Sequence, residues 1–136
     1  MVAAAKTAAT KAAGPVPRLL VVDDERDIAL VVKIGLERHG FSVDTANRPG
    51  EALEKFAKAA YDLVILDMRL PEMDGLALYQ KMKEMRKDTR MCFLTAYDKE
   101  YYRGSSKKFN DLPDKCFIHK PVSLPELVKL INAELE

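Results

Sequence analysis

The sequence has no tryptophan, only two cysteines among 136 residues, and no excess of charge of either sign. With 22 basic against 21 acidic residues, it lacks the basic balance of a chain that coats nucleic acid or an anionic membrane. It also lacks any apolar run approaching the ~20 residues that cross a bilayer. We therefore expect a cytoplasmic protein with no membrane partner and no direct DNA binding.

The two cysteines, Cys92 and Cys116, both lie in apolar segments and lack the spacing of a metal site. We interpret them as buried free thiols in a reducing compartment, where disulfides are rare. A disulfide is the alternative.

The first 17 residues contain no acid and consist almost entirely of Ala, Lys, Thr, Gly and Pro. A short alanine-rich stretch is a marginal helix on its own, and residues 14–17 (GPVP) break any helix. We expect a disordered leader over residues 1–17, with a cleaved organelle-targeting peptide as the alternative. One folded domain is expected over residues 18–136.

From Arg18 onward, short apolar runs alternate with segments of helical periodicity. The pattern predicts an α/β fold of flavodoxin-like type, with a doubly wound, five-stranded parallel sheet of strand order 2-1-3-4-5. Strands are predicted at residues 19–22, 41–45, 63–66, 91–94 and 116–119, and helices at residues 28–39, 49–60, 76–85 and 124–135.

Two predicted helices need comment. The helix at residues 28–39 is inferred from residues at helical spacing, Ile28, Val31, Val32 and the pair Gly35 and Leu36. A fourth helix is expected between Tyr97 and Lys115, but that segment has few apolar residues and is interrupted by Gly-Ser-Ser at residues 104–106. We predict that this fourth helix is short or mobile.

Polar side chains follow four of the predicted strands. Asp23 and Asp24 follow the first, Asp67 the third, Thr95 the fourth and Lys120 the fifth. These strand ends converge on one crevice in a doubly wound sheet, and three close carboxylates repel unless a hard cation such as Mg²⁺ neutralises them. The hydroxyl and the ammonium suit a phosphoryl group, which an ionised Asp67 would accept as an acyl phosphate.

Each of these residues, taken alone, has a purely structural explanation. The acids at residues 23–27 could cap a helix, Asp67 could be a turn residue, Thr95 a satisfied strand-end hydroxyl and Lys120 a solvated charge. The chemical interpretation depends on their joint placement at the ends of the correct strands, in order.

Four segments resemble response-regulator receiver domains of two-component signalling systems, especially chemotaxis-type single-domain receivers: residues 20–25 (LVVDDE), 63–75 (LVILDMRLPEMDG), 94–96 (LTA) and 119–121 (HKP). The resemblance covers residues 18–136. It implies that Asp67 is the phospho-acceptor. It also implies that Mg²⁺ is held by Asp23, Asp24, Asp67 and the backbone carbonyl of Arg69.

The resemblance further implies that Thr95 and Lys120 contact the phosphoryl group, that Phe117 is the switch aromatic, and that Pro121 follows a cis peptide bond. The phosphoryl group would come from a histidine kinase or phosphotransfer protein. A changed surface of fourth helix, fifth strand and fifth helix would then control an unknown downstream protein. Such a domain is not a conventional enzyme, but it catalyses its own phosphorylation and slow autodephosphorylation, as a monomer or weak dimer.

The sequence departs from the family before the fifth strand, where residues 109–115 (FNDLPDK) replace the usual Gly-Ala motif and put the output geometry in doubt. The sequence offers no second core, helix-turn-helix segment or basic patch for DNA, which fits either a stand-alone receiver or a domain excised from a larger regulator. We expect a stand-alone receiver, because the leader resembles a native terminus more than a cut.

Three other functions are alternatives: a phosphatase, a flavin-binding flavodoxin and a pseudo-receiver. The residues argue against the first two. A phosphatase of the haloacid dehalogenase type needs a second Asp where Arg69 stands, and the acids at residues 23–25 would repel the phosphate of a flavin. A pseudo-receiver that acts by protein contact alone, without phosphorylation, is the main alternative.

Overall fold

A computed structural model of the chain describes residues 16–68, 70, 72–95, 117–120 and 122–136. Within this part, five parallel strands form one sheet of order β2-β1-β3-β4-β5, which confirms the predicted fold. The expected leader, apart from its last two residues, lies outside the described residues, as does the expected fourth helix.

The elements agree with the predicted ones to within a few residues. The strands are β1 (Arg18–Val22), β2 (Ser42–Ala46), β3 (Leu63–Asp67), β4 (Arg90–Thr95) and β5 (Phe117–His119). The described helices are α2 (Arg26–Glu37), α3 (Pro49–Lys58), α4 (Gly75–Met85) and α7 (Leu124–Leu135).

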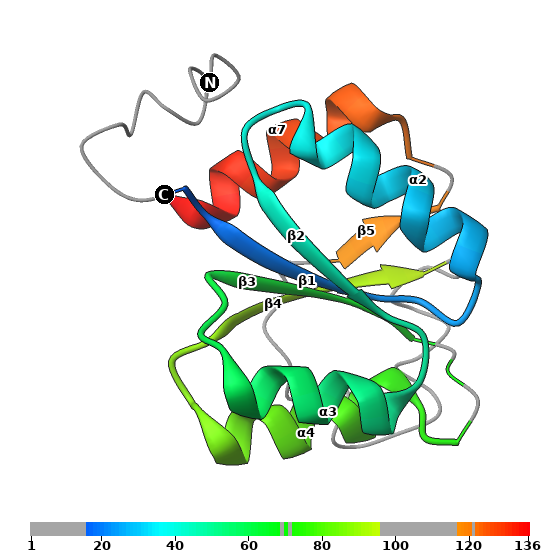
Figure 1. The fold of residues 1–136 in the computed structure, drawn as a ribbon, viewed down its shortest axis with the longest axis vertical. Helices are drawn as coiled ribbons and strands as arrows, with labels where there is room; N and C mark the ends of the chain where they lie inside the picture. The colour runs from blue at the N-terminus through cyan, green and yellow to red at the C-terminus, as the bar shows by residue number, and fades with distance from the viewer. Residues whose placement is uncertain (1–15, 69, 71, 96–116, 121) are drawn as a thin grey trace.

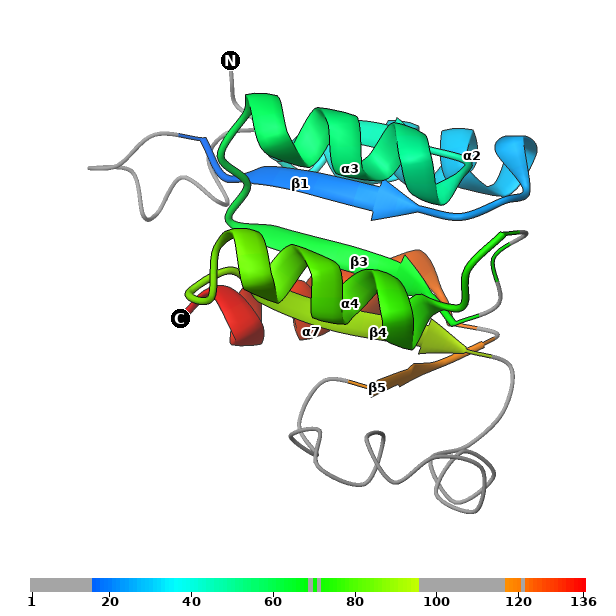
Figure 2. The same cartoon turned by 90° about the horizontal axis from the view of Figure 1, so that it is seen from below.

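The sheet forms the middle of three layers, with α2 and α7 on one face and α3 and α4 on the other (Figures 1 and 2). Successive strand residues point to opposite faces, so each strand supplies both cores. Leu20 and Leu66 pack with the α3 and α4 side, whereas Leu19 and Ile65 pack with the α2 and α7 side. The sheet therefore has no solvent-facing side at its centre, as expected for parallel strands.

Helix α2 buries only some of the apolar residues from which it was predicted: Leu36 is buried and Val32 is partly buried. It begins at Arg26, and its buried residues are Ala29, Gly35 and Leu36. Val31 is 69% exposed and Ile28 is 40% exposed. The small residues face inward because the helix packs closely there: a Cβ on Gly35 would lie 2.7 Å from the end of the Leu124 side chain on α7.

Cys92 contradicts the expectation of free thiols. It is buried in β4 and disulfide-bonded, and no described cysteine is free. Cys116 lies outside the described residues. The expectation came from the apolar segments that hold both cysteines and from the rarity of disulfides in a reducing compartment, and neither feature excludes a disulfide.

None of the helices in the described ranges combines the length and the apolar character that a membrane crossing requires.

Candidate functional site

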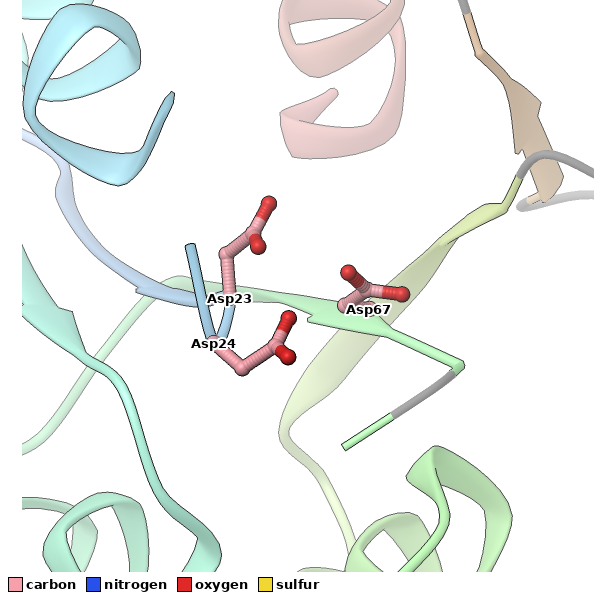
Figure 3. A group of neighbouring side chains, drawn as sticks. All are labelled: Asp23, Asp24 and Asp67. Atoms are coloured by element: carbon pink, nitrogen blue, oxygen red, sulfur yellow. The ribbon is translucent and has the colours of Figure 1, made fainter. Parts of the chain in front are cut away.

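Three carboxylates gather where β1 and β3 end, as Figure 3 shows. Val22 at the end of β1 pairs with Leu66 on β3, so the next residues, Asp23 just after β1 and Asp67 at the end of β3, lie side by side. Each of Asp23, Asp24 and Asp67 offers an oxygen, and these oxygens all lie within 4.8 Å of one another. Asp23 and Asp67 are buried, at 1% and 7% exposed, whereas Asp24 is exposed.

Lys120 brings a positive charge to this cluster from the end of β5, an edge strand of the sheet. It follows β5 directly, and its Nζ donates to Asp67 Oδ2 at 3.2 Å and lies 3.7 Å from Asp23 Oδ2. Burial disfavours the charged form of Lys120, but the carboxylates of Asp67 and Asp23 together outweigh burial and raise the pKa of its ammonium. Lys120 therefore stays charged and faces the acids as a cation.

One ammonium does not offset three carboxylates, and the remaining negative charge contributes to a raised pKa of Asp23. Burial is the largest cause that raises the pKa of Asp23, and the charges of Asp67 and Asp24 raise it further. The Glu25 N–H, which donates to Asp23 Oδ1 at 2.9 Å, and the Lys120 charge act in the opposite direction. The acids form a compact, oxygen-only donor set with unbalanced negative charge, which fits a hard divalent cation such as Mg²⁺.

The start of α4 is packed tightly against the backbone that carries Asp67. The Asp74 side chain caps the helix by accepting from the Ala77 N–H at 2.8 Å, and the Gly75 N–H donates to the Met68 carbonyl at 2.9 Å. A Cβ built on Gly75 would lie only 2.5 Å from the Asp67 carbonyl oxygen. Glycine is required for this close approach, a role that the sequence pattern did not reveal.

The end of β2 and the loop that follows it also contact the site, through residues that sequence reasoning missed. The Ala46 carbonyl accepts from the Asp23 N–H at 3.0 Å, and the Asn47 side-chain amide donates to the Asp23 carbonyl at 2.9 Å. The available signal was positional, because Asn47 follows the second strand at the same edge of the sheet as the acids.

The remaining predicted residues are only partly described. Thr95 ends β4 and pairs with His119, but its side chain lies outside the description, as do Arg69 and Pro121 in full. Phe117 is half-buried on β5, and its ring stacks on that of Phe93 with centroids 5.2 Å apart. The structure thus brings four of the predicted site residues together and leaves the roles of the others as predictions.

Comparison with known proteins assigns nearly the whole described fold to one family. A family model described as the response regulator receiver domain matches residues 19–132. The transcriptional regulatory protein DltR of Streptococcus agalactiae is 37% identical over 115 residues, which are 85% of this chain and 50% of that protein. ResD of Bacillus subtilis, also a transcriptional regulatory protein, is 35% identical over 120 residues, 87% of this chain and 48% of ResD. The chain spans about half the length of these relatives.

Solved structures give the same result. The response regulator TrrA of Thermotoga maritima, in complex with Mg²⁺ and BeF, is 35% identical with a TM-score of 0.75, over 88% of this chain and 99% of that one. A CheY-like receiver domain from Methanospirillum hungatei is 30% identical with a TM-score of 0.77, over 89% of this chain and 94% of that one.

The names of the curated relatives contradict the expectation of a protein without DNA among its partners, because those relatives are transcriptional regulators. That expectation was wrong because it used only the charge and motifs of this chain, which spans about half the length of the relatives it matches.

Proposed function

This chain belongs to the response regulator receiver domain family of two-component systems, and we propose that it is a signalling switch controlled by phosphorylation of Asp67. One observation carries the proposal: Asp67 lies among two further carboxylates and the Lys120 ammonium at the carboxyl edge of the sheet. Purely structural roles for these four residues would not require their convergence from the ends of three strands.

In the proposed reaction, an Asp67 carboxylate oxygen attacks the phosphorus of a phosphohistidine on a histidine kinase or phosphotransfer protein. A P–O bond forms, the P–N bond breaks, and the imidazole leaves with the electron pair and takes up a proton. The protein contributes alignment and charge compensation more than covalent chemistry. Lys120, whose Nζ is 3.2 Å from Asp67 Oδ2, is placed to face the charge on the transferred group.

Asp23, Asp24 and Asp67 supply the oxygen ligands for the proposed Mg²⁺, with the Arg69 carbonyl as a further ligand by resemblance. Bound there, the ion would neutralise charge between carboxylate and phosphoryl oxygens. Burial of Asp23 and Asp67 limits competition from water, so charge compensation at this edge is stronger than on an open surface.

Propagation of the signal is proposed from the family pattern. Thr95 would contact the phosphoryl group, and the Phe117 ring, stacked on Phe93 in this structure, would change position in response. Phosphorylation can shift this equilibrium only through contacts that differ between the two states. From the names of DltR and ResD, we infer that the output is regulation of transcription.

The test is labelling with acetyl phosphate and Mg²⁺, followed by intact-protein mass spectrometry. The wild type should gain one phosphoryl group that is stable in acid and labile in base, and Asp67→Asn should gain none. Asp88→Asn, which changes an exposed aspartate in the turn before β4, is the matched control and should label normally. Equal labelling of Asp67→Asn and the wild type would reject Asp67 as the phospho-acceptor, and no labelling of the wild type would favour the pseudo-receiver.

A further inference from the structure

The peptide groups on both sides of the Asp23 Cα are held by the last residue of β2 and by the loop residue that follows it. The Asp23 N–H donates to the Ala46 carbonyl at 3.0 Å, and the Asp23 carbonyl accepts from the Asn47 side-chain amide at 2.9 Å. The second bond is the important one, since the Asp23 carbonyl belongs to the peptide that joins Asp23 to Asp24. Asn47 therefore fixes the plane of the peptide between two carboxylates of the acidic cluster.

The two carboxylates depend on this peptide to different degrees. The Asp23 carboxylate has its own anchor, the Glu25 N–H at 2.9 Å, and lies 3.7 Å from Lys120 Nζ. Asp24 is exposed, and no hydrogen bond to its carboxylate is found in the described part of the chain. Its placement within 4.8 Å of the other acid oxygens thus follows from the backbone that Asn47 holds.

Asn47 is itself anchored and can act as a fixed support. Its N–H donates to Glu51 Oε1 at 2.9 Å, a bond from the residue before the helix cap to the first turn of α3. This hydrogen bond is the largest cause that lowers the pKa of Glu51, and Lys55 pairs with the same carboxylate at 3.2 Å. The side-chain amide that reaches Asp23 therefore belongs to a residue whose backbone is tied to a helix.

We propose that Asn47 is a positioning residue for the Mg²⁺ site, setting the approach of Asp24 to Asp23 and Asp67 through the Asp23 carbonyl. The inference rests on the proposed function for the identity of the cation. It predicts that loss of the Asn47 amide weakens cation binding more than it weakens the fold. Removal of a group that orients metal ligands typically costs ten- to a hundredfold in affinity. We expect about tenfold here, at the lower end, because Asn47 acts through the backbone.

The experiment compares Asn47→Leu, of similar size but without a donor, with Arg48→Gln in the same loop. Arg48 pairs with Glu72 on the surface, where both side chains are more than half exposed, and exposed pairs contribute little. Mg²⁺ alone is titrated into each full-length protein and followed by amide NMR shifts. The dissociation constant should rise about tenfold in Asn47→Leu and stay within roughly twofold of wild type in Arg48→Gln. At saturating Mg²⁺, Asn47→Leu should react with acetyl phosphate at nearly the wild-type rate.

A second measurement needs no cation. Amide hydrogen exchange in metal-free protein should become faster at Glu25, whose N–H is held by Asp23, while exchange at Leu66 in β3 stays as in wild type. A general loss of stability would accelerate both amides and would overturn the positioning role. Unchanged Mg²⁺ affinity in Asn47→Leu, or a loss no larger than that of Arg48→Gln, would also overturn it.

Failure of the proposed function gives a different result. A wild-type protein that shows no Mg²⁺-dependent shifts would remove the cation site and, with it, the effect of Asn47 on affinity. Exchange at Glu25 would still decide whether Asn47 holds the turn. Wild-type Mg²⁺ binding without phosphorylation would reject the phospho-acceptor role of Asp67 and leave the Asn47 comparison intact.

Discussion

Replacement of Gly75 by alanine tests how tightly the start of α4 is packed against the backbone of Asp67. Within a helix, alanine is normally better than glycine by about 0.5–1 kcal/mol. At Gly75, however, the new Cβ would lie 2.5 Å from the Asp67 carbonyl oxygen and 2.8 Å from the Met68 Cα. Both are backbone atoms, so no side-chain rotation relieves the overlap. Overpacking costs typically about 1–3 kcal/mol, so we expect a net loss of about 1–2 kcal/mol in the free energy of unfolding.

The assay is urea unfolding followed by circular dichroism, with Gly50→Ala as the matched control. Gly50 also lies in the first turn of a helix, α3, but nothing lies within 4 Å of its added Cβ. Gly50→Ala should therefore stabilise the protein by about 0.4–1 kcal/mol. If Gly75→Ala proved as stable as Gly50→Ala, the close approach of α4 to Asp67 would be refuted. A tolerated Gly75→Ala that still shifts the NMR signals of Asp67 would instead mean that the strand moves easily.

Three further predictions concern other parts of the molecule. Burial and the 2.6 Å hydrogen bond to Asp44 raise the pKa of Tyr61 to about 12, so the fold favours its neutral phenol. That stabilisation is complete below the unfolded pKa of about 10 and is lost as the pH rises toward 12. The difference in unfolding free energy between the wild type and Tyr61→Phe should therefore fall by about 2–3 kcal/mol across this range, as measured by urea titrations. A difference that does not change with pH would contradict this prediction. The Arg86 guanidinium donates to three carbonyls at the end of α3, those of Phe56, Ala57 and Ala59. Arg86→Met should therefore lower the free energy of unfolding by about 1–3 kcal/mol. Lys58→Met, which changes an exposed side chain in the last turn of α3, should change it little. Mg²⁺ at ten times its dissociation constant should raise the unfolding free energy by about 1.4 kcal/mol. Asp24→Asn should lose that gain but be more stable than wild type in EDTA, because like-charge repulsion is relieved; lower stability in EDTA would argue against an unbalanced acidic cluster.

The sheet and the acidic cluster could be predicted because both follow from regular features of the sequence. Apolar runs alternate with helical periods, and the carboxyl ends of parallel strands meet at one edge, which places Asp23, Asp67 and Lys120 together. Such reasoning needs only the position of a residue relative to a strand end. It does not need the details of any loop.

The features that escaped prediction depend on single side-chain contacts. The Asn47 amide reaches a backbone carbonyl, and a neutral loop residue leaves no periodic or charge signal for such a bond. Gly75 had the sequence signature of an ordinary turn, whereas its role is a close approach between a helix and a strand. The apolar residues of α2 show a related limit, since apolar residues on several sides of a helix do not reveal which side is buried.

The strand order also has a consequence for the growing chain on the ribosome. Synthesis proceeds from the amino end, so β1 and β3 are available with their acids well before β5 delivers Lys120. A nascent domain that has paired only its first strands carries the three carboxylates without the ammonium that partly offsets them. Docking of the edge strand β5 is then the step that brings this counter-charge. A chain arrested before that step should depend on dissolved cations more than the finished protein does.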